Sequence, residues 1–258
     1  MEETVDFPLG RFERKYLVTD EVAIAVRDAI RPFVDYDVHM PPNSVRGYVV
    51  HSLYLDNASL DLYQQTRQCQ SERFKLRIRF YDHQAQGKAY VEIKEKSGGQ
   101  VYKRRYGTTK EVIESMLNDP RSDLLAHELS NGARGSALEE FCRVRDEIAA
   151  DPKLFVTYDR EAYNSNSGPQ VRVTFDRRIR ANPFGRNAGL DVPRFGQNVG
   201  GLNVLLEFKY AGDPPEWVQD ALDTFVLKRA SFSKFAECID ALGITGQAPR
   251  EVKVSRKK

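Results

Sequence analysis

The sequence predicts an α+β protein built around an antiparallel β-sheet. Segments in which polar and apolar residues alternate, the period of a half-buried strand, are interspersed with segments of period 3.6, the period of an amphipathic helix. In addition, three strand-like segments follow one another with only short polar turns between them, which indicates an antiparallel meander. With 258 residues, of which 41 % are apolar, the chain is long enough to bury a substantial core.

The first half of the chain alternates strands with two helices. A helix is expected before Pro32, because Val22, Val26, Ala29 and Ile30 fall on one face. The meander is expected to turn at Gly87 and again at residues 97–99. The predicted strands are residues 11–18, 45–55, 74–81, 89–96 and 101–107, and the predicted helices are residues 20–30 and 60–68.

The middle of the chain, about residues 108–150, is predicted to be a helical insertion. Thr108 and Glu111 have capping-box spacing, and Ser136 and Glu139 repeat it. We expect one domain over residues 1–258 with a flexible basic tail from about residue 246. The remaining predictions are strands at 154–163, 171–180 and 204–210, a long loop at 182–201, a helix capped by Asp213, and a helix at 233–242.

Composition excludes several classes of protein. The three cysteines are dispersed and form no CxxC pair, which argues against a disulfide framework and against a zinc site. No apolar run is long enough to span a membrane, and residues 1–10 do not resemble a signal peptide, so a cytoplasmic location is expected. The formal net charge is only +2, so the distribution of charge matters more than its total.

The polar faces of the predicted strands carry an unusual amount of charge. In residues 74–81, Lys75, Arg77 and Arg79 alternate with large apolar residues. The other charged positions on such faces are Glu13, Lys15, Glu92, Lys94, Lys96, Arg172, Asp176, Glu207 and Lys209, with Thr174 between two of them. These faces together hold eight cations and four acids, whereas the opposite faces are apolar.

Two structures are compatible with this pattern. In one, the sheet is open, its charged face meets water, and opposite charges pair weakly across strands. In the other, the sheet closes with the charged face inside and the helices pack on the apolar outside. A buried cationic interior is costly unless it is neutralised, so the closed structure needs a polyanionic ligand, a divalent metal ion or both.

Several motifs resemble a known family. Glu13 and Lys15 form an E-x-K motif, Arg77 and Arg79 an R-x-R motif, and Glu92 and Lys94 a second E-x-K motif. With RFERKYLV, SLYLDN, FKLRIRFY, VEIKEKSGGQVYKRR, VTYDREAY, VRVTFDRRIR, LLEFKY and FSKF, which span residue 11 to about residue 236, the chain resembles the CYTH superfamily of triphosphate tunnel metalloenzymes. It resembles more closely the VTC domain, the polyphosphate polymerase domain of vacuolar transporter chaperone proteins.

The resemblance implies an eight-stranded antiparallel β-barrel, a tunnel with helices packed outside, that holds a triphosphate or polyphosphate with Mn²⁺ or Mg²⁺. It implies transfer of the terminal phosphoryl group of ATP to a growing inorganic polyphosphate chain. Superfamily relatives instead hydrolyse triphosphate, make cyclic AMP or process thiamine triphosphate. The chain shows no sign of the additional domains of larger family assemblies, so a free-standing version is expected.

The resemblance also implies roles for individual residues. Lys234 corresponds to a family lysine near the transferred phosphate and, with Arg77 and Arg79, is the candidate catalytic set. Glu207 is the first candidate metal ligand and Glu13 the second; alternatively Glu13 and Glu92 orient lysines, and Lys234 is merely solvated. The candidate phosphate-binding residues are Lys15, Arg77, Arg79, Lys94, Lys103 (or Arg105), Arg160, Arg172, Lys209, Lys228 and Lys234.

Three other functions are compatible with parts of the pattern. A tripolyphosphatase would use the same phosphate-binding residues with water as the acceptor. A non-catalytic polyphosphate-binding module would keep the cations without needing a metal ligand. A nucleic-acid binder is disfavoured, because its stacking aromatics should share a face with the cations, and here they lie on the opposite one. His51, expected in a strand, and His127, expected in a helix, are predicted to be structural.

Overall fold

The computed structural model describes residues 11–40, 47–82, 87–98, 100–133, 136–185 and 189–245. Contacts divide the chain into two compact units that interleave along the sequence. The first unit contains the described residues of Val50–Thr157 and Arg180–Gln197, and the second contains those of Phe7–Val49, Tyr158–Ile179 and Asn198–Lys258. The predicted basic tail lies outside the described residues.

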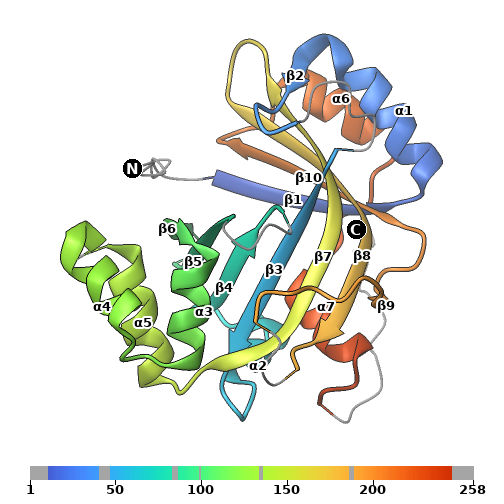
Figure 1. Cartoon of the computed structure of the whole chain (residues 1–258). Helices are drawn as coiled ribbons and strands as arrows, with labels where there is room; N and C mark the ends of the chain where they lie inside the picture. The colour runs from blue at the N-terminus through green and yellow to red at the C-terminus, as the bar shows by residue number, and fades with distance from the viewer. Residues whose placement is uncertain are drawn as a thin grey trace. The chain divides into compact units, whose positions relative to one another are not determined.

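The elements confirm the alternation of strands and helices (Figure 1). The strands are β1 (Arg11–Val18), β2 (Val34–Tyr36), β3 (Tyr48–Asp56), β4 (Arg73–Phe80), β5 (Lys88–Ser97), β6 (Gln100–Thr109), β7 (Asp151–Ser165), β8 (Val171–Pro183), β9 (Gln197–Asn198) and β10 (Val204–Ala211). The α-helices are α1 (Asp20–Ile30), α2 (Asp61–Arg67), α3 (Lys110–Asn118), α4 (Asp123–Glu128), α5 (Ala137–Glu147), α6 (Glu216–Thr224) and α7 (Lys234–Ala241). A 3₁₀ turn (Arg31–Phe33) follows α1, and a π-helical turn (Leu129–Ala133) follows α4.

The predicted fold class, α+β with a large antiparallel sheet, is confirmed. Within the described residues the main path of the sheet has eight strands, in the order β1-β10-β8-β7-β3-β4-β5-β6, and β2 and β9 pair with β7 and β8. The pairs β1–β10, β10–β8, β2–β7, β3–β4, β4–β5 and β5–β6 are antiparallel. Closure of this path into a tunnel stays a prediction. None of the helices that the structure describes is both long and apolar enough to cross a bilayer.

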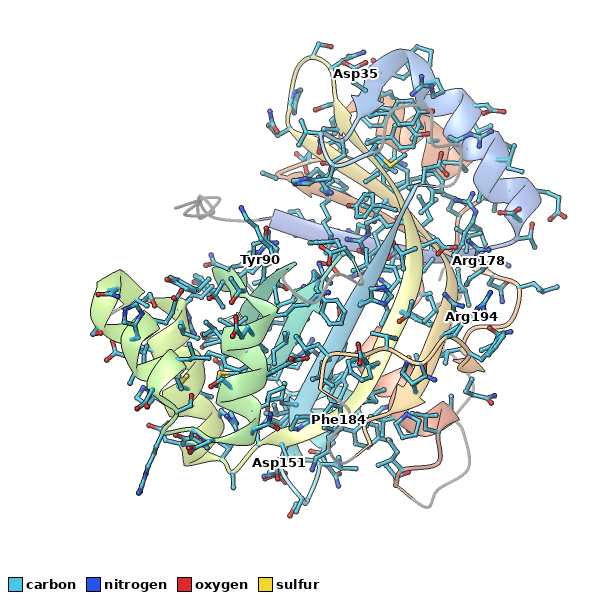
Figure 2. The ribbon with its side chains drawn as sticks, in the orientation of Figure 1. Asp35, Tyr90, Asp151, Arg178, Phe184 and Arg194 are labelled. Carbon is cyan, nitrogen blue, oxygen red and sulfur yellow. The ribbon has the colours of Figure 1, made fainter. Side chains whose placement is uncertain are left out.

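The first unit is a meander covered by the helical insertion. Its apolar face includes Leu76, Ile78 and Ile93, all buried, and helices α3 and α5 contact β5 and β6. The end of β8 also belongs to this unit. Phe184, labelled in Figure 2, directly follows β8, and its ring centroid lies 5.6 Å from that of Phe155. Packing of one face by helices leaves the opposite, charged face of β4, β5 and β6 to form a site.

The second unit has an apolar face of the same kind. Phe175, Leu206 and Phe208, from neighbouring strands, form a core with Val26 of α1 and Val218 of α6. Each large side chain buried in this way contributes about 1.5–3 kcal/mol relative to exposure. Because side chains alternate along a strand, the polar residues of β1, β8 and β10 lie on the other face of this sheet.

Several local predictions were wrong. Thr109, not Thr108, caps α3: its side chain accepts a hydrogen bond from the Val112 backbone N–H. Pro215, not Asp213, precedes the first residue of α6, and no side chain caps that helix. Ala29 is exposed and Ala23 is buried instead, because α1 is rotated slightly from the predicted face.

The remaining differences between prediction and structure are short elements that were not predicted. Helix α4 and the π-helical turn were not predicted, because their six and five residues are too short for a clear period. The predicted long loop contains the two-residue strand β9. His51 lies in a strand and His127 in a helix, as predicted; His51 Nδ1 is 3.0 Å from Thr157 Oγ1.

Candidate functional site

The polar face of the second unit gathers charged residues from strands that are neighbours in the sheet. In the register of β1 and β10, Lys15 lies opposite Glu207 and Glu13 lies opposite Lys209. Strand β8 adds Asp176, strand β7 adds Arg160, and α7 adds Lys234. We call these seven residues the carboxylate–lysine cluster: Glu13, Lys15, Arg160, Asp176, Glu207, Lys209 and Lys234.

Glu207 is the centre of this cluster. Its side chain is 4 % exposed, and its carboxylate oxygens lie 3.1 Å from Lys234 Nζ, 3.2 Å from Lys209 Nζ and 3.6 Å from Lys15 Nζ. Glu13 contacts the same Lys15 ammonium at 2.9 Å. Three ammonium groups therefore contact one buried carboxylate. Two of them, Lys15 and Lys209, were predicted from the strand pattern to lie on the same charged face as Glu207.

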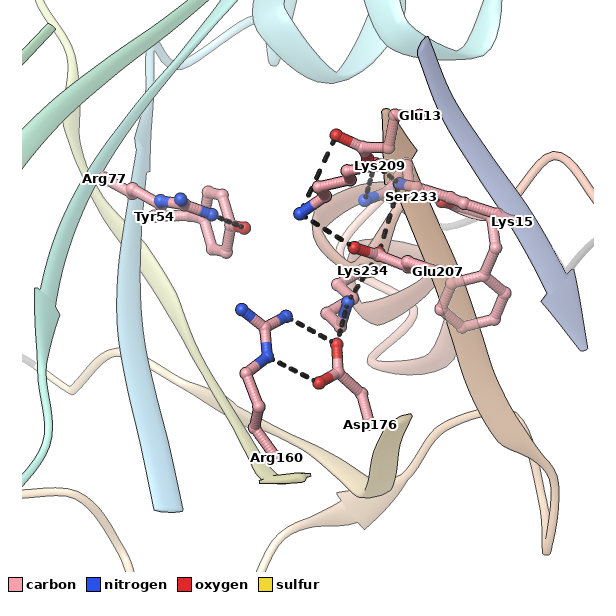
Figure 3. Close-up of polar contacts among 12 residues, drawn as sticks. Glu13, Lys15, Tyr54, Arg77, Arg160, Asp176, Glu207, Lys209, Ser233 and Lys234 are labelled. Atoms are coloured by element: carbon pink, nitrogen blue, oxygen red, sulfur yellow. Dashed lines mark hydrogen bonds and ion pairs between the residues drawn. The ribbon is translucent and has the colours of Figure 1, made fainter. Parts of the chain in front are cut away.

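Lys234 links Glu207 to Asp176 (Figure 3). Its ammonium lies 2.6 Å from Asp176 Oδ2, and Ser233 caps the helix that carries it by accepting a hydrogen bond from the Ala236 N–H. The alternative that Lys234 is merely solvated is therefore wrong, since its side chain is only 9 % exposed. A lysine in the first turn of α7 is placed where the helix dipole also favours anions.

Arg160 holds the other side of Asp176 through two hydrogen bonds of 2.7 Å, from Nε and Nη2 (Figure 3). The backbone at Arg160 is closely approached by Gly47, which has φ +78°; a Cβ there would lie 1.9 Å from the Arg160 carbonyl oxygen. Tyr158 lies beneath both cations, with Arg160 and Lys234 at 5.1 and 4.9 Å from its ring centroid. The guanidinium is thus fixed by its partners on several sides.

The charges in this cluster hold one another ionised. Burial opposes ionisation of Glu207, but Lys234, Lys209 and Lys15 outweigh it and hold the pKa of its carboxyl well below its usual range. Burial likewise opposes charge on Lys234, but Asp176 and Glu207 raise its pKa above the ordinary lysine value. At neutral pH Glu207 is therefore a carboxylate and Lys234 an ammonium.

Two other predicted residues lie in the second unit but are engaged differently. Arg172 is on the polar face of β8, and its guanidinium is bound by the buried Asp37, which also accepts a hydrogen bond from Asn164. Lys228 is exposed after α6, and the contacts of the carboxylate–lysine cluster do not include it. Binding of phosphate by Arg172 would therefore compete with Asp37.

The polar face of the first unit carries a second group, the arginine cluster: Arg77, Arg79, Glu92, Lys103 and Arg105. Glu92, fully buried, accepts a 2.5 Å hydrogen bond from Arg77 Nε and lies 2.8 Å from Lys103 Nζ and 3.5 Å from Arg105 Nε. Arg77 Nη1 also donates to the Tyr54 hydroxyl at 3.3 Å. Three cations thus contact one carboxylate. Orientation of neighbouring lysines by Glu92, the role weighed for it from the sequence, stays a prediction.

An adjoining row of the same sheet contains cations alone. Lys75 lies opposite Lys94, and Lys94 lies opposite Lys103, on three consecutive strands. Like charges directly opposite each other destabilise a sheet. The register therefore places three lysines side by side on this face.

Lys103 responds to this surplus of positive charge. Burial, with Arg77 and Arg79, lowers the pKa of its ammonium to about 7, although Glu92 acts in the opposite direction. Its side chain is nevertheless 38 % exposed, so it can reach a ligand from solvent. The same arginines and Lys103 outweigh the burial of Glu92 and hold the pKa of that carboxyl well below its usual range.

The carboxylates of the carboxylate–lysine cluster are the candidate ligands of a divalent ion. No group of three His, Cys, Asp or Glu side chains within the described ranges could enclose a metal. Glu207 and Glu13 contact the same lysine and are hard oxygen donors, which suits Mg²⁺ or Mn²⁺ held by two carboxylates and completed by phosphate oxygens and water. The residues therefore fit an ion that binds together with a phosphate ligand.

Some contacts in these clusters were not predicted. Asp176 was recognised only as a charge on the strand face, and its pairing with Arg160 and Lys234 follows from the arrangement of three separate segments. Asp37 gave no signal, because it follows a three-residue strand. Tyr158 and Tyr54 belong to strand segments whose sequence pattern does not distinguish them from other strand residues.

The chain is similar in sequence to proteins of a known family. The family model described as the VTC domain matches residues 10–243. The vacuolar transporter chaperone complex subunit 4 of Schizosaccharomyces pombe is 22 % identical over 229 residues, which cover 75 % of this chain and 32 % of that protein. This chain therefore spans about a third of the length of that relative.

Three solved structures align with most of this chain, each with a TM-score below 0.5. HpAC1 from Hippeastrum, a candidate adenylyl cyclase with a dominant triphosphatase activity, has a TM-score of 0.48 at 19 % identity, covering 89 % of this chain and 95 % of its own. A candidate adenylate cyclase from Bacillus halodurans scores 0.45 at 15 % identity, covering 86 % and 94 %. PH1819 from Pyrococcus horikoshii OT3 scores 0.45 at 13 % identity, covering 92 % and 99 %.

Proposed function

Because the chain belongs to the VTC domain family, we propose that it is a polyphosphate polymerase-like phosphotransferase. It would transfer the terminal phosphoryl group of ATP to a growing inorganic polyphosphate chain. The chief support is the carboxylate–lysine cluster, in which Lys234 and Arg160 are buried, charged and held in fixed positions by Asp176. We also carry forward the single tunnel domain and the cytoplasmic location as parts of this proposal.

The proposed step needs positioning and charge neutralisation rather than covalent catalysis. A terminal oxygen of the polyphosphate attacks the γ-phosphorus of ATP, a new P–O bond forms, and the bond to the β–γ bridging oxygen breaks. ADP leaves with the bonding electron pair. Lys234 and Arg160 would neutralise charge on the phosphoryl oxygens. The proposal also assigns phosphate binding to Arg77 and Arg79 of the first unit, because a guanidinium is a forked donor.

The other proposed ligands act as point charges. Lysine ammonium groups bind phosphate without the geometric selectivity of a guanidinium. Mn²⁺ or Mg²⁺ bound by Glu207 and Glu13 would neutralise negative charge on phosphate oxygens. The proposed phosphate-binding lysines are Lys15, Lys94, Lys103, Lys209 and, at the periphery, Lys228; Arg172 joins them if phosphate displaces Asp37.

The direct test is incubation of the protein with ATP and Mn²⁺, with and without a short polyphosphate primer. The expected result is ADP together with phosphate chains longer than the primer on a polyacrylamide gel, and the loss of both products when the metal is chelated. Conversion of tripolyphosphate to pyrophosphate and phosphate without chain growth would contradict polymerisation and identify water as the acceptor. Binding of polyphosphate with no turnover of either substrate would contradict catalysis.

A further inference from the structure

Thr174 is a buried polar residue of the second unit that takes no part in the described contacts of the carboxylate–lysine cluster. It lies in β8 and is completely buried. Within the described residues, its Oγ1 hydroxyl has no hydrogen-bond partner. Buried hydroxyl groups almost always have a partner, because burial removes their hydrogen bonds to water. An exception of this kind requires an explanation.

The position of Thr174 supplies one. The register places it directly opposite Glu207, on the face of the sheet that carries the carboxylate–lysine cluster. Its neighbours on the same face of β8 are Arg172 and Asp176, two residues away on either side. Side chains directly opposite on antiparallel strands have Cβ atoms about 4.5–5.5 Å apart. The hydroxyl therefore lies among the groups proposed to bind phosphate.

The acceptors around this hydroxyl are already engaged. Glu207 is bound by lysines, and Asp176 by Arg160 and Lys234. The nearby cations are donors and cannot accept a hydrogen bond. The hydroxyl is thus an additional donor beside cations, a combination that matches an oxygen atom of an anionic ligand.

We propose that Thr174 Oγ1 donates a hydrogen bond to a phosphate oxygen of the bound triphosphate or polyphosphate. This inference rests on the proposed function, because it needs a phosphate ligand at the carboxylate–lysine cluster. The Thr174 hydroxyl is a neutral hydrogen-bond donor beside Glu207. A hydroxyl fixes the position of one phosphate oxygen, whereas an ammonium group attracts several, so this donor would orient the ligand as well as bind it.

The test measures tripolyphosphate binding by calorimetry in EDTA, so that neither metal nor turnover contributes. The variants are Thr174→Val, which keeps the shape and removes the hydroxyl, and Thr174→Ser, which keeps the hydroxyl. We expect affinity to fall about tenfold in Thr174→Val, the usual scale for one hydrogen bond to a charged group. Thr174→Ser should stay within about twofold of wild type, since the donor is retained.

Unfolding of the ligand-free proteins supplies a matched control. Thr157 is a second buried strand threonine, but its hydroxyl is paired with His51. Thr157→Val should lower the thermal midpoint, because it leaves the buried imidazole nitrogen without its partner, whereas Thr174→Val should leave the midpoint unchanged or higher.

Two results would overturn the inference while the proposed function stands. Wild-type affinity in Thr174→Val would show that the hydroxyl takes no part in binding. A midpoint lowered as much as in Thr157→Val would show that the hydroxyl has a partner within the protein. Absence of binding by the wild-type protein is a different outcome, which overturns the proposed function and the inference together.

Discussion

Replacement of Glu207 by Gln tests the centre of the carboxylate–lysine cluster. The change keeps size and one hydrogen-bond acceptor, but it removes the charge that Lys234, Lys209 and Lys15 share. At separations of this order each pair is worth about 5 kcal/mol before desolvation is subtracted, taking an effective dielectric constant of about 20. Because Glu207 is buried, the three ammonium groups would repel one another with little help from water.

The net loss of stability is smaller than the sum of these attractions. Removal of one member of a buried ion pair typically costs about 3–5 kcal/mol, and the retained amide favours the lower end, about 3 kcal/mol. For a protein of this size that loss lowers the thermal midpoint by about 6–12 °C. Glu147→Gln is the matched control, because Glu147 forms an exposed pair with Arg143 on α5 and should cost less than about 0.5 kcal/mol.

The stability lost in Glu207→Gln should depend on pH in a definite direction. The folded-state pKa of Glu207 lies well below its unfolded value, so its stabilising contribution is present above the unfolded pKa and is lost as pH falls through the folded pKa. The difference in stability between wild type and Glu207→Gln should therefore be largest near pH 7 and shrink as the solution is made acidic. Thermal unfolding measured from pH 7 to pH 3 would show this.

The same variant separates binding from catalysis. Without metal it should bind polyphosphate at least as tightly as wild type, because a repelling carboxylate is gone, whereas Mn²⁺-dependent phosphoryl transfer should be lost. An unchanged midpoint would refute the described ammonium contacts. Wild-type, Mn²⁺-dependent turnover would refute Glu207 as a metal ligand and make Glu13 the next to test.

Four further outcomes are expected. Saturating polyphosphate at low salt should raise the thermal midpoint of wild type by several degrees, because it binds the folded state, and an unchanged midpoint would argue against a cationic site. Arg77→Ala should weaken tripolyphosphate binding by about 2–5 kcal/mol in calorimetry, and an equal effect of Arg143→Ala on the surface would indicate non-specific attraction. Lys103, whose pKa is about 7, loses its charge as pH rises from 6 to 8; wild-type affinity should fall over this range more than that of Lys103→Met, and parallel profiles would contradict the assignment. Lys234→Ala should lose turnover and also weaken binding of the terminal phosphate, whereas Glu207→Gln should lose turnover without weaker binding. Retained single-turnover transfer by Lys234→Ala would exclude Lys234 from the reaction.

The faces of the strands could be predicted from the sequence alone. The alternation of Lys75, Arg77 and Arg79 with apolar residues places these cations on one face, because successive side chains of a strand point to opposite sides. The opposite face was correctly predicted to be apolar, and Leu76 and Ile78 are buried. This much follows from backbone geometry, which is the same in every strand.

The pairing of charges was decided by tertiary structure. Asp176 meets Lys234, which lies far along the chain on a helix, and Arg172 meets Asp37, 135 residues away. No local pattern specifies such partners, because they depend on which strands are neighbours and on where the connecting segments return. The sequence therefore determined which residues carry the charge and which side of the strand they occupy, while the fold determined which cations share a carboxylate and which hydroxyl was left without a partner.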